Sequence, residues 1–318
     1  MNHKTPIAFL FIGLLLIASC NNPTETIVME SEQIIDAVPS ASGVVYTKNA
    51  YWLIGDDASF LYKMNMDNQI LEKFRISSLN NKKNGRLLKG LKPDFEALDL
   101  IDNNLLILGS GSKEISRDTA VLFNLTSKKV VQKKSLRKLY DRFLFVGGFD
   151  STKSINIEAF VSDKNYCYLM HRGNVCGKNV IFQIEKNQWK TYWETNELPD
   201  VQSHFVELPK IDGYLSGFSG ACLSADGQYL LFTSSVEATK DVYHDGEVLG
   251  SFVGSIPIKG EQAWLSHKAF LLKHKDHIVK TKLESISVIN YLDGVYQLLA
   301  VSDNDNGKSG IYHLTLNQ

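Results

Sequence analysis

Three glutamates recur in the same local setting along this chain. Each stands just before a short apolar strand: Glu96 in FEALDLI, Glu158 in IEAFVS and Glu284 in LESISVI. Carboxylates that are brought close together repel one another and raise each other's pKa unless a cation compensates them. Their chemistry therefore depends on whether the fold gathers these three segments.

The three segments belong to a long internal repeat. Two further segments share the pattern with a glycine at the glutamate position, Gly43 and Gly220. The anchors at 43, 96, 158, 220 and 284 are 53, 62, 62 and 64 residues apart. Each unit contains short β-branched and aromatic runs separated by Asn, Asp, Gly and Lys turns, which predicts short strands.

The units read as four strands each. We expect strands at 43–46, 51–55, 60–65 and 70–76, then at 97–101, 105–109, 120–125 and 130–135, and then at 159–162, 167–171, 180–184 and 189–193. The last unit supplies three, at 285–289, 297–301 and 311–316, and segment 26–35 can add the fourth. The basic run 127–142 predicts an outer strand followed by a solvated helical turn.

Repeated four-stranded units predict an all-β fold, a β-propeller with five blades. The residues before Gly43 and after Glu284 together make one more normal spacing, so pairing of the N- and C-terminal strands would close the ring and remove an exposed edge. Six blades would follow if one long unit were subdivided. We expect a single propeller domain over residues 26–318.

The first nineteen residues have the pattern of a secretory signal. A basic residue precedes a twelve-residue apolar run, residues 7–18, which is too short to span a bilayer. Ile17-Ala18-Ser19-Cys20 resembles the lipobox of bacterial lipoproteins, which implies cleavage before Cys20 and its acylation. We expect residues 20–25 to be a lipid-anchored tether and the protein to be exported to the cell envelope. The membrane is the partner through Cys20, and Asn21 in place of an aspartate favours the outer membrane. A plain signal peptide with an incidental cysteine is the alternative.

The charge balance excludes a strongly basic nucleic-acid-binding class. The chain has 34 basic and 35 acidic residues, and loss of residues 1–19 removes one basic residue. Neither nucleic acid nor an anionic lipid surface is a predicted electrostatic partner. Cys167 and Cys176 flank a predicted turn, so a local disulfide and two free thiols are both open. The sequence contains neither Cys-x-x-Cys nor His-x-x-x-His, which argues against a zinc site.

In a propeller, the first strand of each blade lines the central channel and the second strand returns to the same face. We therefore expect Glu96, Glu158 and Glu284 at one mouth of the channel, beside the ends of the second strands. Those ends carry polar side chains: Asp56, Asp57, Ser110, Ser112, His171, Arg172, Ser234, Glu237, Asp303 and Asp305.

Three arrangements would stabilise such a ring of glutamates. A calcium ion would take oxygen ligands from all three. Arg172, Arg117 or Lys308 would compensate them by ion pairing, with Glu158 the expected partner of Arg172. Alternatively, the glutamates would accept hydrogen bonds from backbone N–H groups of the neighbouring blade and fix the register between blades.

Glu-Ala at a strand start, with GSGS or SDND at a strand end, resembles the phytase-like β-propellers, which include esterase-like-phytase domains and uncharacterised bacterial lipoproteins. Glu96-Ala97 and Glu158-Ala159 match, Glu284-Ser285 matches loosely, and Gly43 and Gly220 do not. The resemblance implies the propeller fold and, with calcium, phosphoester hydrolysis. Dense acidic strings like those of propeller phytases are lacking apart from Asp303-Asn304-Asp305, and a fold does not fix a function.

Functions of different classes remain open. One is a module that binds a small polar ligand or an envelope protein at the channel mouth, since the sequence lacks a nucleophile elbow, a Walker loop and a dinucleotide fingerprint. Another is a metal-dependent hydrolase of phosphoesters or related esters, and a third is a scaffold in an envelope complex. The long connection 236–251 reads as a surface hairpin or as a lid that carries Glu237, Lys240, His244 and Asp245.

Overall fold

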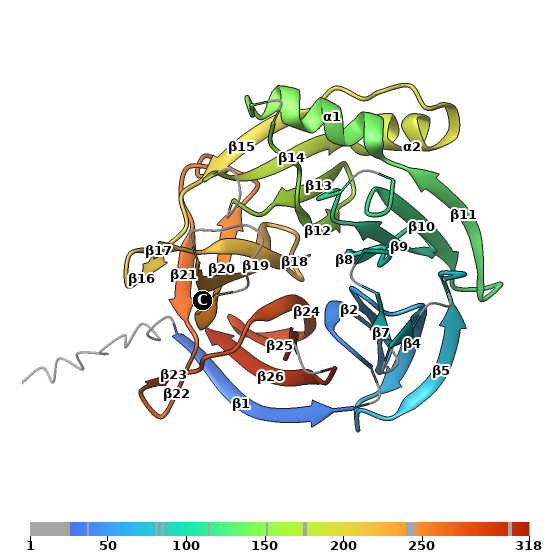
Figure 1. The fold of residues 1–318 in the computed structure, drawn as a ribbon. Coiled ribbons are helices and arrows are strands. Elements are labelled where there is room, and N and C mark those ends of the chain that lie inside the picture. The colour runs from blue at the N-terminus through green and yellow to red at the C-terminus, as the bar shows by residue number, and fades with distance from the viewer. Residues whose placement is uncertain are drawn as a thin grey trace, which may run out of the picture.

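The structure is a computed structural model that describes residues 26–36, 38–79, 82–83, 86–88, 90–113, 115–150, 152–173, 177–239, 246–304 and 307–317. Five four-stranded antiparallel sheets stand around one axis, so the chain is an all-β propeller with five blades (Figure 1). The predicted fold and the number of blades are confirmed.

The blades follow one another along the chain, and the first strand of each is innermost. Blade 1 consists of β2 (Ala41–Thr47), β3 (Ala50–Gly55), β4 (Phe60–Asn65) and β5 (Ile70–Arg75). Blade 2 consists of β8 (Phe95–Ile101), β9 (Asn104–Gly109), β10 (Thr119–Asn124) and β11 (Lys129–Ser135). Blade 3 consists of β12 (Ile157–Ser162), β13 (Tyr166–His171), β14 (Asn179–Glu185) and β15 (Gln202–Val206). Blade 4 consists of β18 (Gly217–Leu223), β19 (Tyr229–Ala238), β20 (Glu247–Pro257) and β21 (Lys268–Leu271). Blade 5 consists of β24 (Leu283–Leu292), β25 (Val295–Asp303), β26 (Ser309–Asn317) and β1 (Thr26–Ile35).

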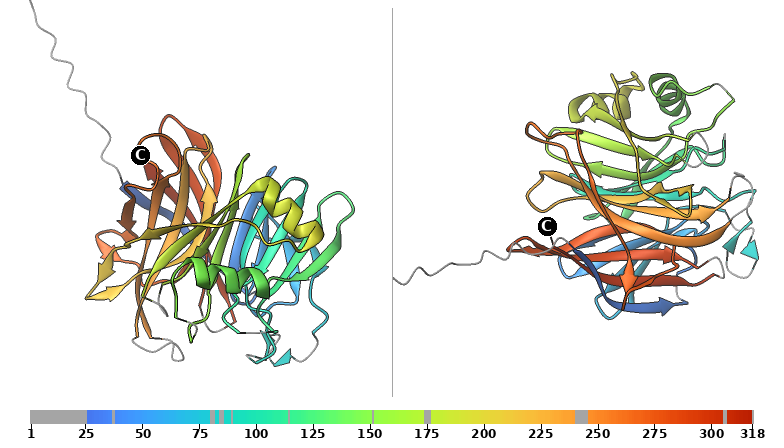
Figure 2. Two further views of the ribbon diagram at one scale, coloured as in Figure 1. Left: turned by 90° about the horizontal axis from the view of Figure 1, so that it is seen from above. Right: turned by 90° about the vertical axis from the view of Figure 1, so that its left-hand side faces the viewer.

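Smaller elements lie between and around the blades. Three two-stranded hairpins are β6 (Lys82–Lys83) with β7 (Arg86–Leu87), β16 (Lys210–Ile211) with β17 (Tyr214–Leu215), and β22 (Lys273–His274) with β23 (His277–Ile278). The helices α1 (Arg137–Val146) and α2 (Lys186–Thr195) lie at the rim, outside the blades (Figure 2). Neither of these helices is long and apolar enough to cross a membrane, and no other helix lies in the described ranges.

The core lies between neighbouring blades. In β9, Leu105 and Ile107 pack into the cluster shared with blade 1, whereas Leu106 and Leu108 pack into the cluster shared with blade 3. Successive side chains of a strand point to opposite faces, so a strand covered on both sides is apolar at every position. This explains the uninterrupted apolar runs that mark the repeat.

The two ends of the described chain close the ring. β1 pairs antiparallel with β26 from Thr26 opposite Asn317 to Ile35 opposite Ser309. Figure 1 shows β1 beside β26 at the outer edge of blade 5. The predicted closure is therefore confirmed, and β1 covers the edge that β26 would otherwise expose.

The fourth strand of blade 3 was predicted wrongly. Residues 189–193 lie in α2, and the strand is β15, further along the chain. Trp189 and Tyr192 are both buried, and their spacing of three residues places both on one face of a helix. The helical turn expected within 127–142 is the beginning of α1, which also buries Leu139, Tyr140 and Phe143.

Hydrogen bonds between inner strands fix the register of neighbouring blades. The backbone N–H of Val44 donates to Ser285 Oγ at 3.1 Å, and that of Tyr46 donates to Ser287 Oγ at 2.9 Å. The N–H of Ser162 in blade 3 donates to Asp99 Oδ2 in blade 2 at 2.9 Å. Ser285, Ser287 and Asp99, and not the glutamates, therefore accept these hydrogen bonds between blades.

Cys167 and Cys222 are free thiols. Cys167 is buried, and burial raises its pKa to about 12, which keeps it protonated and unreactive. Cys20 and Cys176 lie outside the described residues.

Tyr312 on β26 ties the closing strand to its surroundings. Its hydroxyl donates to Glu32 Oε1 on β1 at 2.9 Å and contacts Thr281 Oγ1 and Ser302 Oγ at 3.0 and 3.3 Å. We expect Tyr312→Phe to lower the free energy of unfolding by about 1–2 kcal/mol, because buried partners lose a hydrogen bond. Urea unfolding measures this, with the half-exposed Tyr291→Phe as the matched control. Equal stability of both variants would contradict the role of Tyr312 in closure.

Candidate functional site

Every innermost strand begins with a β-bulge at the same end of the axis, which we call the mouth. The pairing register skips one residue between Ala41 and Gly43, and in the same way at the start of β8, β12, β18 and β24. An extra residue in a bulge is left out of the ladder and its side chain is redirected. The five residues in this position form what we call the bulge ring: Ser42, Glu96, Glu158, Ser219 and Glu284.

The bulge ring corrects the sequence alignment by one residue in two blades. Gly43 and Gly220 were aligned with the glutamates, but Ser42 and Ser219 hold the equivalent positions. A Cβ on Gly43 would lie 2.8 Å from Leu98 Cβ, and one on Gly220 would lie 2.5 Å from Ser285 Cα. These glycines therefore allow adjacent inner strands to approach closely. The two serines are buried, and their hydroxyls donate to Phe95 O and to Thr233 Oγ1.

The residues that follow the second strands also lie at the mouth, as expected from the topology. The N–H groups of Asp56, Ser110 and Arg172 each donate to a carbonyl that lies two residues before the bulge of the same blade. Their acceptors are the carbonyl oxygens of Ser40, Asp94 and Asn156, at 3.1, 2.9 and 2.9 Å. This repeated backbone geometry gathers side chains from distant parts of the sequence.

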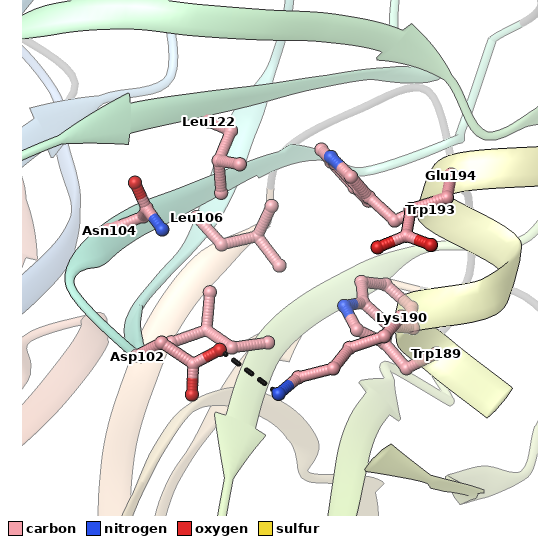
Figure 3. Close-up of a pocket in the computed structure, with 9 residues that line it drawn as sticks. Asp102, Asn104, Leu106, Leu122, Trp189, Lys190, Trp193 and Glu194 are labelled. Atoms are coloured by element: carbon pink, nitrogen blue, oxygen red, sulfur yellow. Dashed lines mark ion pairs between the residues drawn. The ribbon is translucent and has the colours of Figure 1, made fainter. Parts of the chain in front are cut away.

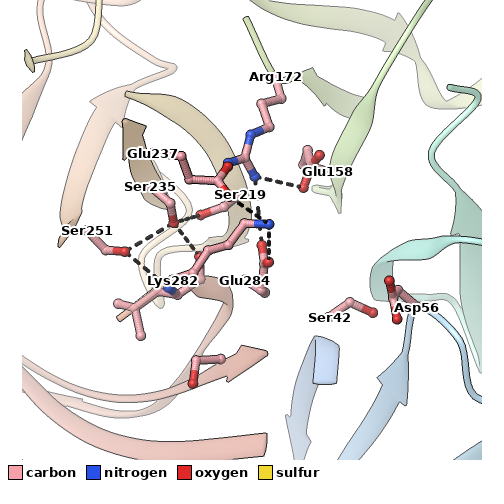
Figure 4. Close-up of polar contacts among 12 residues, drawn as sticks. Ser42, Asp56, Glu158, Arg172, Ser219, Ser235, Glu237, Ser251, Lys282 and Glu284 are labelled. Atoms are coloured by element: carbon pink, nitrogen blue, oxygen red, sulfur yellow. Dashed lines mark hydrogen bonds and ion pairs between the residues drawn. The ribbon is translucent and has the colours of Figure 1, made fainter. Parts of the chain in front are cut away.

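Arg172 lies at the centre of the charges contributed by blades 3, 4 and 5. Its Nη2 is 2.6 Å from Glu237 Oε2, and its Nη1 is 3.6 Å from Glu158 Oε2 and 3.9 Å from Glu284 Oε2 (Figure 4). Lys282 Nζ lies 3.0 Å from Glu284 Oε1 and 3.7 Å from Glu237 Oε1. These five residues form the Arg172 cluster, which confirms ion pairing of Arg172 with Glu158.

Burial and ion pairing oppose each other in the Arg172 cluster. Burial raises the pKa of Glu284 to about 8, although Lys282 and Arg172 lower it. Burial also raises the pKa of Glu158, whose Oε1 accepts a 2.5 Å hydrogen bond from Asn156 Nδ2. Burial also favours a higher pKa for Glu237, but the positive charges of Lys282 and Arg172 outweigh burial, so the pKa of Glu237 is lowered. Each glutamate of this cluster thus has a cation within reach.

A second group of charges lies on blades 1 and 2. Lys92 Nζ pairs with Asp56 Oδ2 and lies 2.8 Å from Asp94 Oδ1. Arg117 Nη1 lies 2.9 Å from Asp94 Oδ2, which also accepts a 2.5 Å hydrogen bond from Ser110 Oγ. Burial opposes the ionised form of Asp94, but Lys92 and Arg117 lower its pKa. We call Lys92, Asp56, Asp94 and Arg117 the Lys92 cluster.

Glu96 belongs to neither set of ion pairs. It is partly exposed, and it makes no hydrogen bond or ion pair with any residue that the structure describes. One of its carboxylate oxygens lies within 4.8 Å of oxygens of Asp56 and Asp94. Burial, followed by the negative charges of Asp94 and Glu158, raises the pKa of Glu96 well above its usual value. Glu96 is therefore the unpaired acid of the mouth, within the part of the chain described.

Other expected site residues have different surroundings. Asp57 is buried and pairs with Arg86. The negative charges of Asp57 and Asp303 raise the pKa of Arg86 against the effect of burial. Lys308 pairs with Asp36 at 3.1 Å. Asp305 and the lid residues Lys240, His244 and Asp245 lie outside the described residues.

His171 was expected at the mouth, but its side chain is fully buried. Its Nδ1 accepts a 2.9 Å hydrogen bond from the N–H of Asn156, and its ring lies 5.0 Å from that of Phe149. Burial lowers the pKa of His171 to about 4, so the ring is neutral. His171 and Arg172 are adjacent in an extended chain and point to opposite sides, so only Arg172 faces the mouth.

Sequence reasoning missed Lys92, Asp94 and Lys282. All three precede a bulge glutamate by two or four residues, in Lys92-Pro-Asp94-Phe-Glu96 and in Lys282-Leu-Glu284. Alternate residues of an extended segment lie on one face. The alternation of charged residues was therefore the available signal that Lys92 and Asp94 lie near Glu96 and that Lys282 lies near Glu284.

A family model matches residues 37–316, nearly the whole described chain. The chain belongs to a family of unknown function, DUF6929. No curated protein matches. Because the family has no assigned activity, the phytase-like resemblance stays a prediction.

Several solved structures resemble this chain at low identity. Virginiamycin B lyase from Staphylococcus aureus is 11% identical, with a TM-score of 0.39 over 90% of this chain and 99% of that one. Glutaminyl cyclase from Myxococcus xanthus is 9% identical, with a TM-score of 0.34 over 61% and 67%. The tail fiber of Staphylococcus aureus phage P68 is 11% identical, with a TM-score of 0.48 over 92% and 53%. Likenesses at this level carry no functional argument.

Removing the central cation should destabilise the fold strongly. We expect Arg172→Met to lower the free energy of unfolding by about 3–5 kcal/mol at neutral pH, because buried carboxylates lose their partner. The deficit should shrink as the pH falls, since the glutamates then take up protons in the folded state. Chemical denaturation over a pH series measures this, with Arg137→Met, which breaks a surface ion pair to Asp141, as the control. A loss no larger than that of the control would contradict the compensation.

We expect Glu96→Gln, in contrast, to raise the free energy of unfolding. A pKa raised in the folded state means that ionisation of Glu96 opposes folding, so the wild type loses stability as the pH rises through that pKa. Gln does not ionise, so the variant should be the more stable protein at high pH and should match the wild type below about pH 4.3, the usual Glu pKa. Thermal unfolding across pH tests this, with the exposed Glu261→Gln as control. A variant that is less stable at high pH would show that Glu96 has a protein partner.

Proposed function

We propose that this protein is a binding module that takes a small polar ligand with a positively charged group at the mouth, and that Glu96 binds this group. The single observation that carries the proposal is that Glu96 makes no ion pair or hydrogen bond with any described residue. It lies among charged side chains that are paired, yet it has no partner of its own within the described chain. A raised carboxyl pKa indicates a site where an added positive charge is favourable.

The charges of the mouth support a cationic ligand. The two clusters and Glu96 together contribute six carboxylates and four cationic side chains. The raised pKa values of Glu96 and Glu284 mean that an added positive charge would favour the ionised forms of both carboxyl groups. Lys92 also supports an ammonium as the positively charged group of the ligand. Its own ammonium already pairs with Asp56 and Asp94, the two carboxylates that lie next to Glu96.

We also propose that the propeller is held at the outer membrane of a bacterial cell envelope by lipid on Cys20. The support is the signal-like run 7–18 followed by the lipobox-like residues 17–20. Residues 20–25 would then form a short tether to β1, which begins at Thr26.

A metal-dependent phosphoester hydrolase is the second candidate. Asp56, Asp94 and Glu96 place one carboxylate oxygen each within 4.8 Å of one another, and hard cations such as calcium prefer oxygen ligands. The phytase-like resemblance favours the same candidate. Lys92 counts against it, because its ammonium is paired with Asp56 and Asp94, so a calcium ion would have to displace it.

Thermal unfolding of the chain from Asn21 onward, with added probes, tests both candidates. The probes are putrescine and ethanolamine as amines, calcium chloride, and succinate as an anion. A ligand that binds the native state raises the melting temperature. We expect the amines to raise it in the wild type and in Glu261→Gln but not in Glu96→Gln, and succinate to have no effect.

The other outcomes separate the candidates. Stabilisation by calcium alone, with calcium-dependent hydrolysis of p-nitrophenyl phosphate that Glu96→Gln abolishes, would replace the first candidate by the second. An amine effect that survives in Glu96→Gln, or no effect of any probe, would contradict the binding of a cationic group by Glu96.

A further inference from the structure

A pocket of about 100 Å³ lies between α2 of blade 3 and the inner hairpin of blade 2 (Figure 3). We call it the tryptophan pocket. It is lined by Ile101, Asp102, Asn104, Leu106, Leu122, Trp189, Lys190, Trp193 and Glu194. β8 starts at the mouth and ends at Ile101, so the pocket lies towards the opposite end of the axis. It is therefore separate from Glu96 and its surroundings.

The pocket has an apolar floor and a polar rim. Leu106 and Trp189 are buried beneath it, and the rings of Trp189 and Trp193 lie 6.0 Å apart. The rim consists of Asp102, Asn104, Lys190 and Glu194. Ligand sites typically combine apolar and aromatic walls with a few polar groups that fix orientation.

The position of Trp193 is fixed by blade 2. Its indole Nε1 donates to Gln132 Oε1, and Lys134 Nζ donates to its carbonyl oxygen at 3.1 Å. α2 lies in the connection between β14 and β15, whereas blades 1, 2 and 4 join their third and fourth strands by shorter turns or loops. α2 is thus additional to the four strands of blade 3, and it contributes Trp189 and Trp193 to the wall of the pocket. Preorganised side chains lower the cost of binding.

The polar rim favours a neutral ligand with several hydroxyl groups. Asp102 is already compensated, because Lys190 and Lys186 lie 3.4 and 3.7 Å from its carboxylate oxygens. Asn104 Oδ1 accepts a 2.9 Å hydrogen bond from Asn124 Nδ2, which leaves the amide hydrogens of Asn104 for a ligand. The carboxylate of the exposed Glu194 can accept hydrogen bonds from hydroxyl groups. An aliphatic side chain would cover the floor but would form no hydrogen bond with Asn104 or Glu194.

We infer that the tryptophan pocket binds one face of a neutral sugar ring. The apolar C–H face of a pyranose suits the tryptophan and leucine floor, and its hydroxyl groups suit the donors and acceptors of Asn104, Lys190 and Glu194. The pocket is small, so it takes one ring and leaves the opposite face of that ring in solvent. This inference is independent of the proposed function at the mouth.

The chain's four tryptophans provide the test. Indole N–H signals of the ¹⁵N-labelled protein are followed during titration with methyl β-D-glucopyranoside, methyl β-D-galactopyranoside and N-acetylglucosamine, up to about 100 mM, where a weak millimolar site saturates. We expect saturable shifts of Trp189 and Trp193. The matched internal controls are Trp52, in the core between blades 1 and 2, and Trp264, which stacks on His204, and both should stay unchanged.

Glu194→Ala changes an exposed rim residue and should leave the fold intact. We expect it to weaken sugar binding about 2- to 12-fold, the loss of one hydrogen bond, whereas the exposed Glu197→Ala should bind as the wild type does. The inference is overturned if no sugar shifts Trp189 or Trp193, if all four indoles move together, or if Glu194→Ala binds as the wild type does. Shifts with N-acetylleucinamide alone would also overturn it and would indicate an apolar side chain as the occupant.

Discussion

The contact between Arg172 and glutamates of three blades is the interaction on which the mouth depends. Ring closure brings the five inner strands together at their starts, and three of the five bulge residues are glutamates. Arg172 compensates Glu158 from blade 3, Glu237 from blade 4 and Glu284 from blade 5, and its side chain is only 4% exposed. A charge so deeply buried is tolerated because its partners are close.

The same constraint explains why Glu96 differs from the other two ring glutamates. Arg172 and Lys282 form ion pairs with the glutamates of blades 3 to 5. Lys92 and Arg117 form ion pairs with the two aspartates of blades 1 and 2, Asp56 and Asp94. Glu96 lies next to both clusters and pairs with neither. The ring is thus chemically uneven around a nearly five-fold backbone. Two of its positions are serines, and one of its acids, Glu96, makes no ion pair with any described residue.

Much of the fold could be predicted from sequence, because each blade repeats the same alternation of apolar strands and polar turns. The pairing of β1 with β26 followed from the missing fourth strand of the last unit. The bulges could not be predicted from this pattern, because a bulge residue can be of any type. In two blades the bulge residues are Ser42 and Ser219, which do not resemble the glutamates of the other three. α2 was mistaken for a strand because its aromatic residues suit either structure, and tertiary packing of Trp189 and Tyr192 decides between them. Which cation reaches which carboxylate depends on side-chain distances that sequence spacing does not contain.

The most direct test of this account is the pKa of Glu96, measured by ¹³C NMR of the side-chain carboxyl groups in the folded protein. Glu237 provides an internal comparison, because it belongs to the Arg172 cluster and its pKa is lowered. The account predicts that Glu96 titrates well above the usual value for glutamate, about 4.3, while Glu237 titrates below it. A Glu96 pKa at or below the usual value would mean that a protein cation already pairs with it, and the mouth would then have no acid left for a ligand.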